Sequence, residues 1–322
     1  MIAFAKVSVC MITYGHEKYI EEAINSILNQ ETNFEFELIL ANDNSLDRTD
    51  EIVQRIIENH KRGSLIKYTK HENNRGMMSN FIWALRQCSG KYIALCEGDD
   101  YWVDSFKLQK QFDLLELNEK YSLVFSNFYF EDEITREVRM SEIHAPSTFD
   151  TNYLIQIFNI RTCTVLFRRI NELFTDFPEN LPYGDYPLFL RSSLFGDIVF
   201  MEDYTAIYRI NLGSITHTID LKIPEQNRFK ILNWFILNNP THKSAGDYSI
   251  AFLTQKLLNR ARIDLTIQVS LRKNFIQFLS LYCKTLFFKN RAVKISLVSV
   301  IKSLIIVMVN KLLIYKNNYF KS

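Results

Sequence analysis

Short apolar runs alternate with amphipathic stretches through the first hundred residues of this 322-residue chain. The apolar runs are residues 6–13, 36–41, 65–69 and 91–96. Each has the length of a buried strand and ends in polar or small turn residues. Residues 20–28 repeat apolar side chains at the spacing of one helix face, and further helices are expected around residues 52–57 and 79–87. The alternation predicts an α/β fold with a mostly parallel sheet and right-handed crossovers.

Three clustered carboxylates follow the last of these predicted strands. Glu97, Asp99 and Asp100 come directly after residues 91–96, and open α/β sheets bind ligands at the carboxyl ends of their strands. Carboxylates at this spacing repel one another unless a cation neutralises them. Magnesium or manganese, which take oxygen ligands and are often shared with a substrate phosphate, fit such a cluster. Taken by itself, the segment also fits a solvated acidic turn.

A length of 322 residues suggests one large domain with an appendage. Hydrophobic residues at 47% and aromatic residues at 14% provide ample material for a core. The five cysteines show no metal-binding spacing, and several lie in predicted core strands. We therefore expect a reduced, cytoplasmic setting. The first predicted strand begins almost at the amino terminus, which leaves no room for a signal peptide. The charged stretch over residues 131–142 is interpreted as a solvated hairpin or loop.

The net charge of +2 conceals an asymmetry between the two ends of the chain. Residues 265–322, termed the basic tail, contain ten Lys or Arg residues and no Asp or Glu, whereas residues 1–264 have a net charge of −8. On one helix, Lys273, Lys284, Arg291 and Lys302 would share a face. Cations on one face and large apolar residues elsewhere suit a helix that lies on an anionic membrane. A helical cap on the main domain, or a subunit contact, is the alternative.

The motifs of the first two thirds of the chain together resemble those of family 2 glycosyltransferases, which have the GT-A nucleotide-sugar fold. The order and spacing of the motifs carry this resemblance. The matching segments are residues 7–9 with Thr13 and Tyr14, residues 42–49, 74–76, 90–93, 97–102 and 184–188, and Tyr208-Arg209 with Gly213-Ser214. The resemblance implies a GT-A domain over residues 1–220 and leaves a helical C-terminal region over residues 221–322.

The resemblance implies a donor site at the ends of the first strands. Thr13 and Tyr14 would border the nucleotide base, and Tyr14 would offer an aromatic face for stacking. Asp43 corresponds to a carboxylate that accepts a hydrogen bond from the base imide, which favours uracil or thymine. Helix capping is its alternative role, although Asp47 is better placed for that. Arg75 would meet the diphosphate, with a surface ion pair as the other interpretation.

The resemblance also assigns a metal site, with departures from the family pattern. Glu97 and Asp99 occupy the place of the Asp-x-Asp signature, and Asp99 is the better ligand for the divalent ion. Glu97 stands where Asp is usual, and Asn42 replaces the first residue of a usual Asp-Asp pair. Asn211 stands where many relatives have a His, which puts a metal or phosphate role there in doubt. The nearby His217 is interpreted as structural.

A transfer with inversion needs a group that takes the proton of the acceptor hydroxyl. Asp185 is the candidate base, since it precedes an apolar helical stretch over residues 188–194 within a matching motif. Its alternative role is to cap that helix. Trp102 and Tyr101 are candidate acceptor-binding residues that would stack on a sugar, with core packing as the alternative for Trp102.

These observations predict a metal-dependent, inverting glycosyltransferase of hexosyl or N-acetylhexosaminyl type. We expect a UDP-sugar donor and a glycan or lipid-linked glycan acceptor in cell-surface polysaccharide synthesis. The expected location is cytoplasmic, peripheral on the inner face of the plasma membrane. A nucleotidyltransferase on a related fold would need a glycine-rich basic loop, and residues 14–18 contain one glycine. A catalytically silent membrane scaffold disagrees with the retained Asp43, Asp99 and Asp185. No nucleic-acid partner is expected, because the cations of the basic tail alternate with apolar runs.

Overall fold

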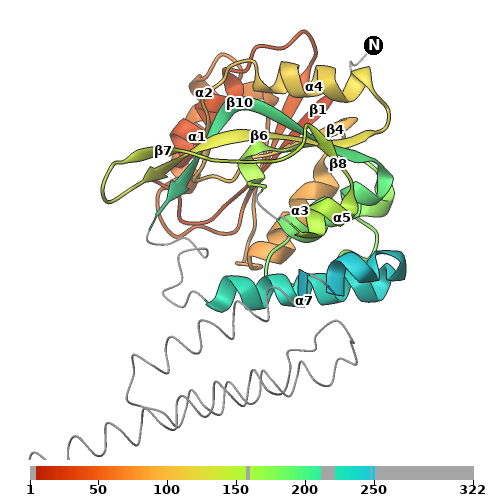
Figure 1. Ribbon diagram of the computed structural model, residues 1–322. Coiled ribbons are helices and arrows are strands. Elements are labelled where there is room, and N and C mark those ends of the chain that lie inside the picture. Colours follow the sequence, from red (N-terminus) through yellow and green to blue (C-terminus); the bar gives the residue numbers. More distant parts are fainter. Residues whose placement is uncertain (1–4, 157–159, 212–221, 248, 251–322) are drawn as a thin grey trace, which may run out of the picture. The chain divides into compact units, whose positions relative to one another are not determined.

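The computed structural model describes residues 5–156, 160–211, 222–247 and 249–250 (Figure 1). The chain divides into two compact units, Met1–Ile219 and Asp220–Ser322. His217 and the whole basic tail lie outside the described part of the chain, and with them the predicted helix face of Lys273, Lys284, Arg291 and Lys302.

The first half of unit 1 alternates strands and helices as the sequence predicts. Its elements are β1 (Val7–Thr13), α1 (Ile20–Leu28), β2 (Phe36–Asn42), α2 (Thr49–Asn59), β3 (Ile66–Lys70), α3 (Met77–Gln87) and β4 (Tyr92–Leu95). The four strands pair in parallel, in the order β3-β2-β1-β4. The carboxyl ends of β2, β1 and β4 therefore lie at the same edge of the sheet.

The second half of unit 1 extends the same sheet with strands of both directions. Its elements are β5 (Tyr101–Trp102), α4 (Lys107–Leu117), β6 (Tyr121–Asp132), β7 (Val138–Met140), β8 (Thr148–Phe149), α5 (Thr151–Gln156), β9 (Leu166–Arg168), α6 (Asp185–Ser192) and β10 (Asp197–Ile210). β9 pairs antiparallel with both β4 and β6, and β6 pairs in parallel with β10. Along the path β3-β2-β1-β4-β9-β6-β10-β5, all strands except β9 and β5 therefore run in one direction. The predicted, mostly parallel sheet is confirmed.

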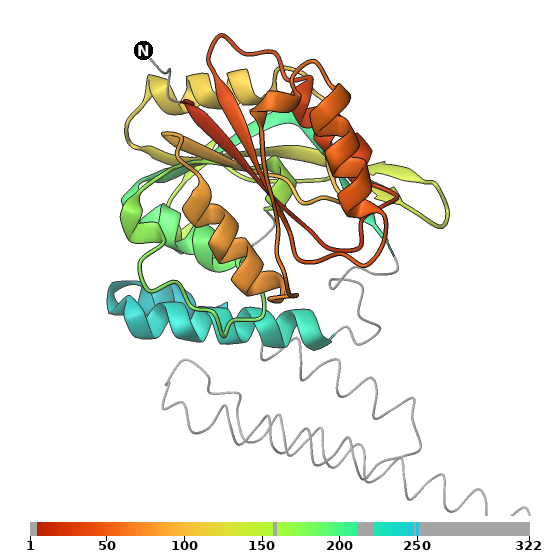
Figure 2. The same cartoon turned by 180° about the vertical axis from the view of Figure 1, so that it is seen from behind.

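Helices cover both faces of this sheet, with α4 on one side and α3 and α5 on the other (Figures 1 and 2). The apolar face of α1 predicted from its spacing is fully buried, and it consists of Ile20, Ala23, Ile24, Ile27 and Leu28. In α2, Val53 and Ile56 are buried. Each of these helices buries one apolar stripe against the sheet. Burial contributes roughly 25 cal/mol of stabilising free energy per Å² of apolar surface, and it is the main source of stability for helices of this length.

Two further expectations concern the surface and the cysteines. The charged stretch over residues 131–142 forms a hairpin, because β7 pairs antiparallel with β6. Among the described residues, Cys10, Cys88, Cys96 and Cys163 are buried free thiols, and burial raises the pKa of Cys88, Cys96 and Cys163.

The described part of unit 2 is helical. α7 (Lys222–Asn238) is followed by a 3-10 turn, Pro240–His242, and Ile231, Leu232 and Phe235 are buried. None of the described helices combines the length and the apolar character needed to cross a membrane.

Candidate active site

The predicted site residues follow strands that are neighbours in the sheet. Thr13 ends β1 and pairs in register with Asn42 at the end of β2. The backbone N–H of Asp43 continues this ladder and donates to the Thr13 carbonyl oxygen over 2.9 Å. On the other side of β1, the N–H of Gly98 donates to the Ile12 carbonyl oxygen over 3.0 Å. The loops after the three strands therefore meet at one edge.

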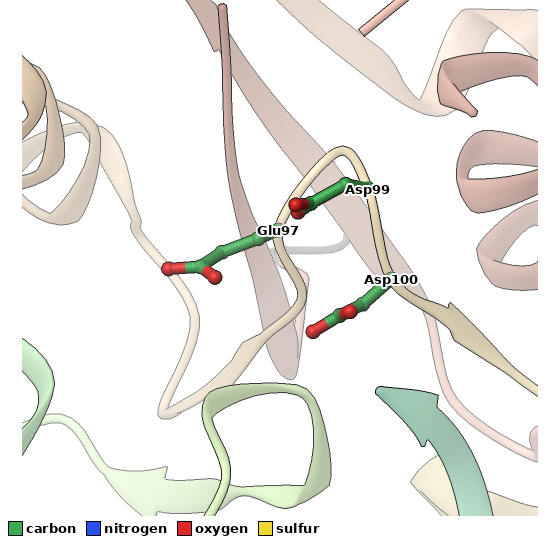
Figure 3. A group of neighbouring side chains, drawn as sticks. All are labelled: Glu97, Asp99 and Asp100. Carbon is green, nitrogen blue, oxygen red and sulfur yellow. The ribbon is translucent and has the colours of Figure 1, made fainter. Parts of the chain in front are cut away.

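The loop after β4 presents a cluster of three carboxylates. Glu97, Asp99 and Asp100 each contribute a carboxylate oxygen, and these oxygens lie within 4.8 Å of one another. Figure 3 shows the three side chains extending to the same side of the loop. Glu97 and Asp99 are partly exposed, whereas Asp100 is buried. The structure thus brings together the two predicted metal ligands and adds Asp100 to them.

The electrostatics of the cluster favour a bound cation. Burial and the neighbouring Asp99 and Asp100 raise the pKa of Glu97 well above its usual range, with a further contribution from Asp185. Burial and Asp99 likewise raise the pKa of Asp100. One Asp100 oxygen, Oδ2, is buried and has no hydrogen-bond partner among the described residues. A divalent cation would supply that partner and remove the mutual repulsion.

Gly98 allows the acidic loop to lie against β1. A Cβ atom at this position would be 2.8 Å from Thr13 Oγ1 and 2.8 Å from His16 Nδ1, too close for a larger residue. Both of these atoms are buried and lack a hydrogen-bond partner within the described part of the chain. His16 Nε2 lies 4.0 Å from Asp99 Oδ2. His16 was not predicted as a site residue, although it follows the predicted Thr13-Tyr14 pair by two residues.

Arg209 of β10 holds the acidic loop from the opposite side. Its backbone N–H donates to Asp100 Oδ1 over 2.9 Å, and its Nη1 donates to the Asp99 carbonyl oxygen over 3.0 Å. The guanidinium also contacts Glu22 and Glu131. Arg209 is 8% exposed. Its buried charge is paired with two carboxylates, of which Glu131 is partly exposed and Glu22 is exposed.

Asn211 is a polar partner of the candidate metal ligand. Its Nδ2 donates to Asp99 Oδ2 over 3.0 Å, which orients that carboxylate. Asn211 therefore contributes to the site by holding a candidate metal ligand in place through its side-chain amide. This is a different role from the metal or phosphate contact that the sequence put in doubt.

At the end of β2, where the nucleotide was expected to bind, Asp43 organises the loop that contains Arg75. Its Oδ1 accepts the Arg75 N–H over 2.7 Å and its Oδ2 accepts the Gly76 N–H over 2.9 Å. Gly76 has a φ of +82°, in the left-handed region that favours glycine. The Arg75 side chain is exposed and meets no carboxylate within the described residues. The carboxylate that was expected to bind a base thus also fixes the backbone beside the expected diphosphate ligand.

Tyr14 and Thr13 differ in accessibility. Tyr14 is 49% exposed, so its ring is available for stacking, whereas Thr13 is 2% exposed. Asp47 lies one residue before the N-cap of α2, Arg48, and accepts the backbone N–H groups of Thr49 and Glu17. These contacts agree with the prediction that Asp47 is better placed than Asp43 to stabilise the start of this helix.

The structure explains why Asn42 replaces an acidic residue. Asn42 Nδ2 donates to the Tyr68 hydroxyl over 2.8 Å, and that hydroxyl donates its own proton to Asp50 Oδ1 over 2.7 Å. Asn42 Oδ1 accepts the N–H and the hydroxyl of Ser45. An ionised aspartate could accept the Ser45 bonds but could not donate to Tyr68.

Asp185 is the first residue of α6, and Gly184 is the N-cap. Asp185 Oδ1 accepts the Tyr186 N–H over 2.7 Å and Oδ2 accepts the Thr162 hydroxyl over 3.3 Å. Burial raises the pKa of Asp185, and its charge contributes to the raised pKa of Glu97. A segment 85 residues or more beyond the acidic loop therefore brings a carboxylate within electrostatic range of it.

The structure corrects the expectation for Trp102. Its side chain is 4% exposed, and its indole N–H donates to the Cys163 carbonyl oxygen over 2.8 Å. The Lys107 ammonium lies 4.2 Å from the ring centroid, and burial lowers the pKa of Lys107 to about 7. Trp102 therefore belongs to the core and has no face for an acceptor. Tyr101 is partly exposed, with Arg209 4.4 Å from its ring centroid.

Comparison with known proteins agrees with this arrangement. The sequence model described as "Glycosyl transferase family 2" matches residues 8–174, just over half of the chain. An uncharacterised protein of Mycobacterium tuberculosis is 30% identical over 213 residues, which are 66% of this chain and 60% of that protein. The chain thus spans about three fifths of the length of this relative. Escherichia coli WfaP, named as a UDP-Glc:alpha-D-GlcNAc-diphosphoundecaprenol beta-1,3-glucosyltransferase, is 28% identical over 65% of this chain and 79% of its own.

Two solved structures show the same fold. S. aureus TarS in complex with UDP-GlcNAc has a TM-score of 0.63 at 20% identity, over 86% of this chain and 79% of that one. The Pyrobaculum calidifontis mannosyltransferase PcManGT, in complex with GDP-Man and Mn²⁺, has a TM-score of 0.54 at 15% identity, over 90% and 89% of the two chains. With its GT-A fold and its match over residues 8–174, the chain belongs to glycosyltransferase family 2.

Proposed function

We propose that this glycosyltransferase transfers a hexosyl or N-acetylhexosaminyl group, with inversion, from a UDP-sugar to a hydroxyl of a glycan or lipid-linked glycan. One observation carries the proposal. Three carboxylates lie within 4.8 Å of one another at the sheet edge that also holds Thr13 and Asp43, and Asp185 lies within electrostatic range of them. A cation site, a base-binding edge and a proton acceptor are the parts that such a transfer needs.

Glu97, Asp99 and Asp100 would hold a magnesium or manganese ion, which would stabilise the negative charge that develops on the leaving nucleotide. The donor set of hard carboxylate oxygens fits these ions. Asn211 and Arg209 keep Asp99 and Asp100 in position. Glu97 and Asp99 are partly exposed, so an ion bound to them could also bind a diphosphate. Magnesium and manganese are commonly shared in this way between carboxylates and a substrate phosphate.

The other residues would bind the donor and move one proton. Tyr14 would stack on the base, each Asp43 oxygen has a lone pair left for the base imide, and Arg75 would meet the diphosphate. Asp185 would take the proton of the acceptor hydroxyl as the new bond to the anomeric carbon forms. The bond between that carbon and the diphosphate breaks, and its electron pair leaves with the nucleotide.

Relatives support this choice of substrates. The name of WfaP specifies UDP-Glc as donor and a lipid-linked diphosphate sugar as acceptor, and TarS has been crystallised with UDP and with UDP-GlcNAc. PcManGT was crystallised with Mn²⁺. For this chain, a role in cell-surface polysaccharide synthesis is part of the same proposal.

We expect a screen of nucleotide sugars to identify a UDP-sugar that the protein hydrolyses slowly in the presence of Mn²⁺ or Mg²⁺ and not in excess chelator. The readout is release of the nucleoside diphosphate, with the thermal melting temperature as a second measure of binding. GDP-sugars serve as the matched control for base selection. Binding without any nucleotide release, with every acceptor tested, would point to a catalytically silent scaffold, and hydrolysis that resists chelator would contradict the metal.

We also propose that the protein works at the cytoplasmic face of the plasma membrane, attached peripherally through the basic tail. The motivating observation is the absence of acidic residues after Asp264. Each cation near an anionic bilayer contributes about 1 kcal/mol, and salt screens this attraction.

Replacing Lys284 and Lys302 by Glu together should therefore weaken co-sedimentation with anionic vesicles. The wild-type protein should leave those vesicles as salt rises, while neutral vesicles should retain little of either protein. Equal partitioning of the wild type and the double variant would refute electrostatic attachment, and the tail would then be examined as a cap or a subunit contact.

A further inference from the structure

Arg161 lies beside the candidate base and is held by aromatic rings. Its guanidinium carbon is 4.8 Å from the ring centroid of Tyr208, 5.9 Å from that of Phe128 and 5.8 Å from that of Phe130. These rings come from β6 and β10. Three aromatic rings hold the guanidinium in place by cation–π contacts. They provide no hydrogen-bond acceptor for the N–H groups, which point outward in the plane of the guanidinium.

The N–H groups of Arg161 have no partner in the described part of the chain. No carboxylate lies within 4 Å of the guanidinium there, and Nε is buried without a hydrogen bond. Arg209 shows the contrast, because its guanidinium, which is more deeply buried, contacts Glu22 and Glu131. A partly buried cation without a counter-ion is costly, and an anionic ligand would offset that cost.

The position of Arg161 relative to Asp185 identifies which substrate could supply the anion. The next residue, Thr162, donates its hydroxyl proton to Asp185 Oδ2 over 3.3 Å, and the Arg161 charge lowers the pKa of Asp185. In an inverting displacement the attacking oxygen and the leaving diphosphate occupy opposite faces of the anomeric carbon. A cation beside the base therefore lies on the side of the acceptor.

We propose that Arg161 binds a phosphate of the acceptor, so that the enzyme prefers acceptor sugars bearing a phosphate at the anomeric position over neutral glycosides. This inference rests on the proposed function, because it uses Asp185 as the base. The guanidinium fork matches two phosphate oxygens. One charge-assisted contact of this kind corresponds to about a tenfold or larger change in affinity.

The test measures ligand binding to the full chain saturated with UDP and Mn²⁺, which keeps the donor site filled. The probes are hexose and N-acetylhexosamine 1-phosphates, each compared by calorimetry with its own methyl glycoside. We expect the wild type to bind at least one 1-phosphate about tenfold or more tightly than the matched glycoside. Arg161→Gln should remove this difference, Arg161→Lys should restore part of it, and Arg86→Gln, an exposed arginine of α3, should leave it unchanged.

Two results would overturn the proposal. One is a wild type with no preference for any phosphate, and the other is an Arg161→Gln protein that loses both ligands equally, which would make Arg161 a positioning residue for Asp185. A wild type that binds no nucleoside diphosphate would refute the proposed donor site instead. The sugar phosphates would then be titrated alone, and the same comparison between wild type and Arg161→Gln would decide the role of Arg161.

Discussion

Asp99→Asn should lower turnover of the nucleotide sugar by about a hundredfold or more while the protein stays folded. The substitution removes one of the three clustered carboxylates and with it part of the charge that a divalent ion needs. The fold should survive because Arg209 binds the Asp99 backbone carbonyl and the Asp100 side chain, and the substitution leaves both in place. The neighbouring Asp99 charge also raises the pKa of Glu97 and Asp100, so its removal should leave the melting temperature equal or higher.

The measurements are initial rates at several Mn²⁺ concentrations and thermal unfolding of each protein without metal. Asp113→Asn makes the same charge change on the exposed face of α4 and is the matched control. The variant should need more metal for half-maximal activity, whereas the control should match the wild type. Full activity of Asp99→Asn at the wild-type metal requirement would remove Asp99 from the metal site.

The first half of the fold was predictable because its signals are local. Helix α1 has the five fully buried apolar residues that its spacing predicts, and β1, β2 and β4 are apolar runs followed by turn residues. The second half depends on pairing between distant segments. β9 has three residues, yet it lies between β4 and β6 in the sheet. No spacing rule in the sequence assigns so short a strand to that place.

The site was predictable to the extent that it lies at strand ends. Thr13 is the last residue of β1, Asp43 follows β2, and Glu97 and Asp99 follow β4. Because these parallel strands are neighbours in the sheet, the meeting of the four residues follows from topology. Arg209 belongs to the matching Tyr208-Arg209 segment, but no site role was predicted for it, because its contact with Asp99 joins residues far apart in the sequence. Arg161 belongs to none of the matching segments, and its place beside Tyr208 also depends on the pairing of distant segments. Trp102 was assigned to the acceptor because sequence does not distinguish an exposed indole from one that donates to a buried carbonyl.

The pH dependence of transfer should reveal the protonation of Asp185. Burial raises the pKa of this carboxyl above its usual range, and a base works only when it is ionised. As pH falls through this raised pKa, the wild-type rate should therefore decline at a higher pH than an ordinary exposed aspartate would give. Because the folded-state pKa is raised, the charged carboxylate lowers the free energy of unfolding at neutral pH. Loss of this charge in a neutral replacement should therefore not destabilise α6.

Asp185→Asn should lower the transfer rate by about a hundred- to ten-thousandfold and leave donor affinity nearly unchanged. The asparagine oxygen can still accept the Tyr186 N–H, and its amide can donate to the Thr162 hydroxyl, so the start of α6 keeps its contacts. Donor affinity would be measured by calorimetry with Mn²⁺ and transfer by single-turnover assays across pH, with Asp113→Asn again as the control. The acidic limb of the wild-type profile should disappear in the variant. Unchanged transfer would exclude Asp185 as the base, and a parallel loss of donor binding and melting temperature would reduce it to a helix-start residue.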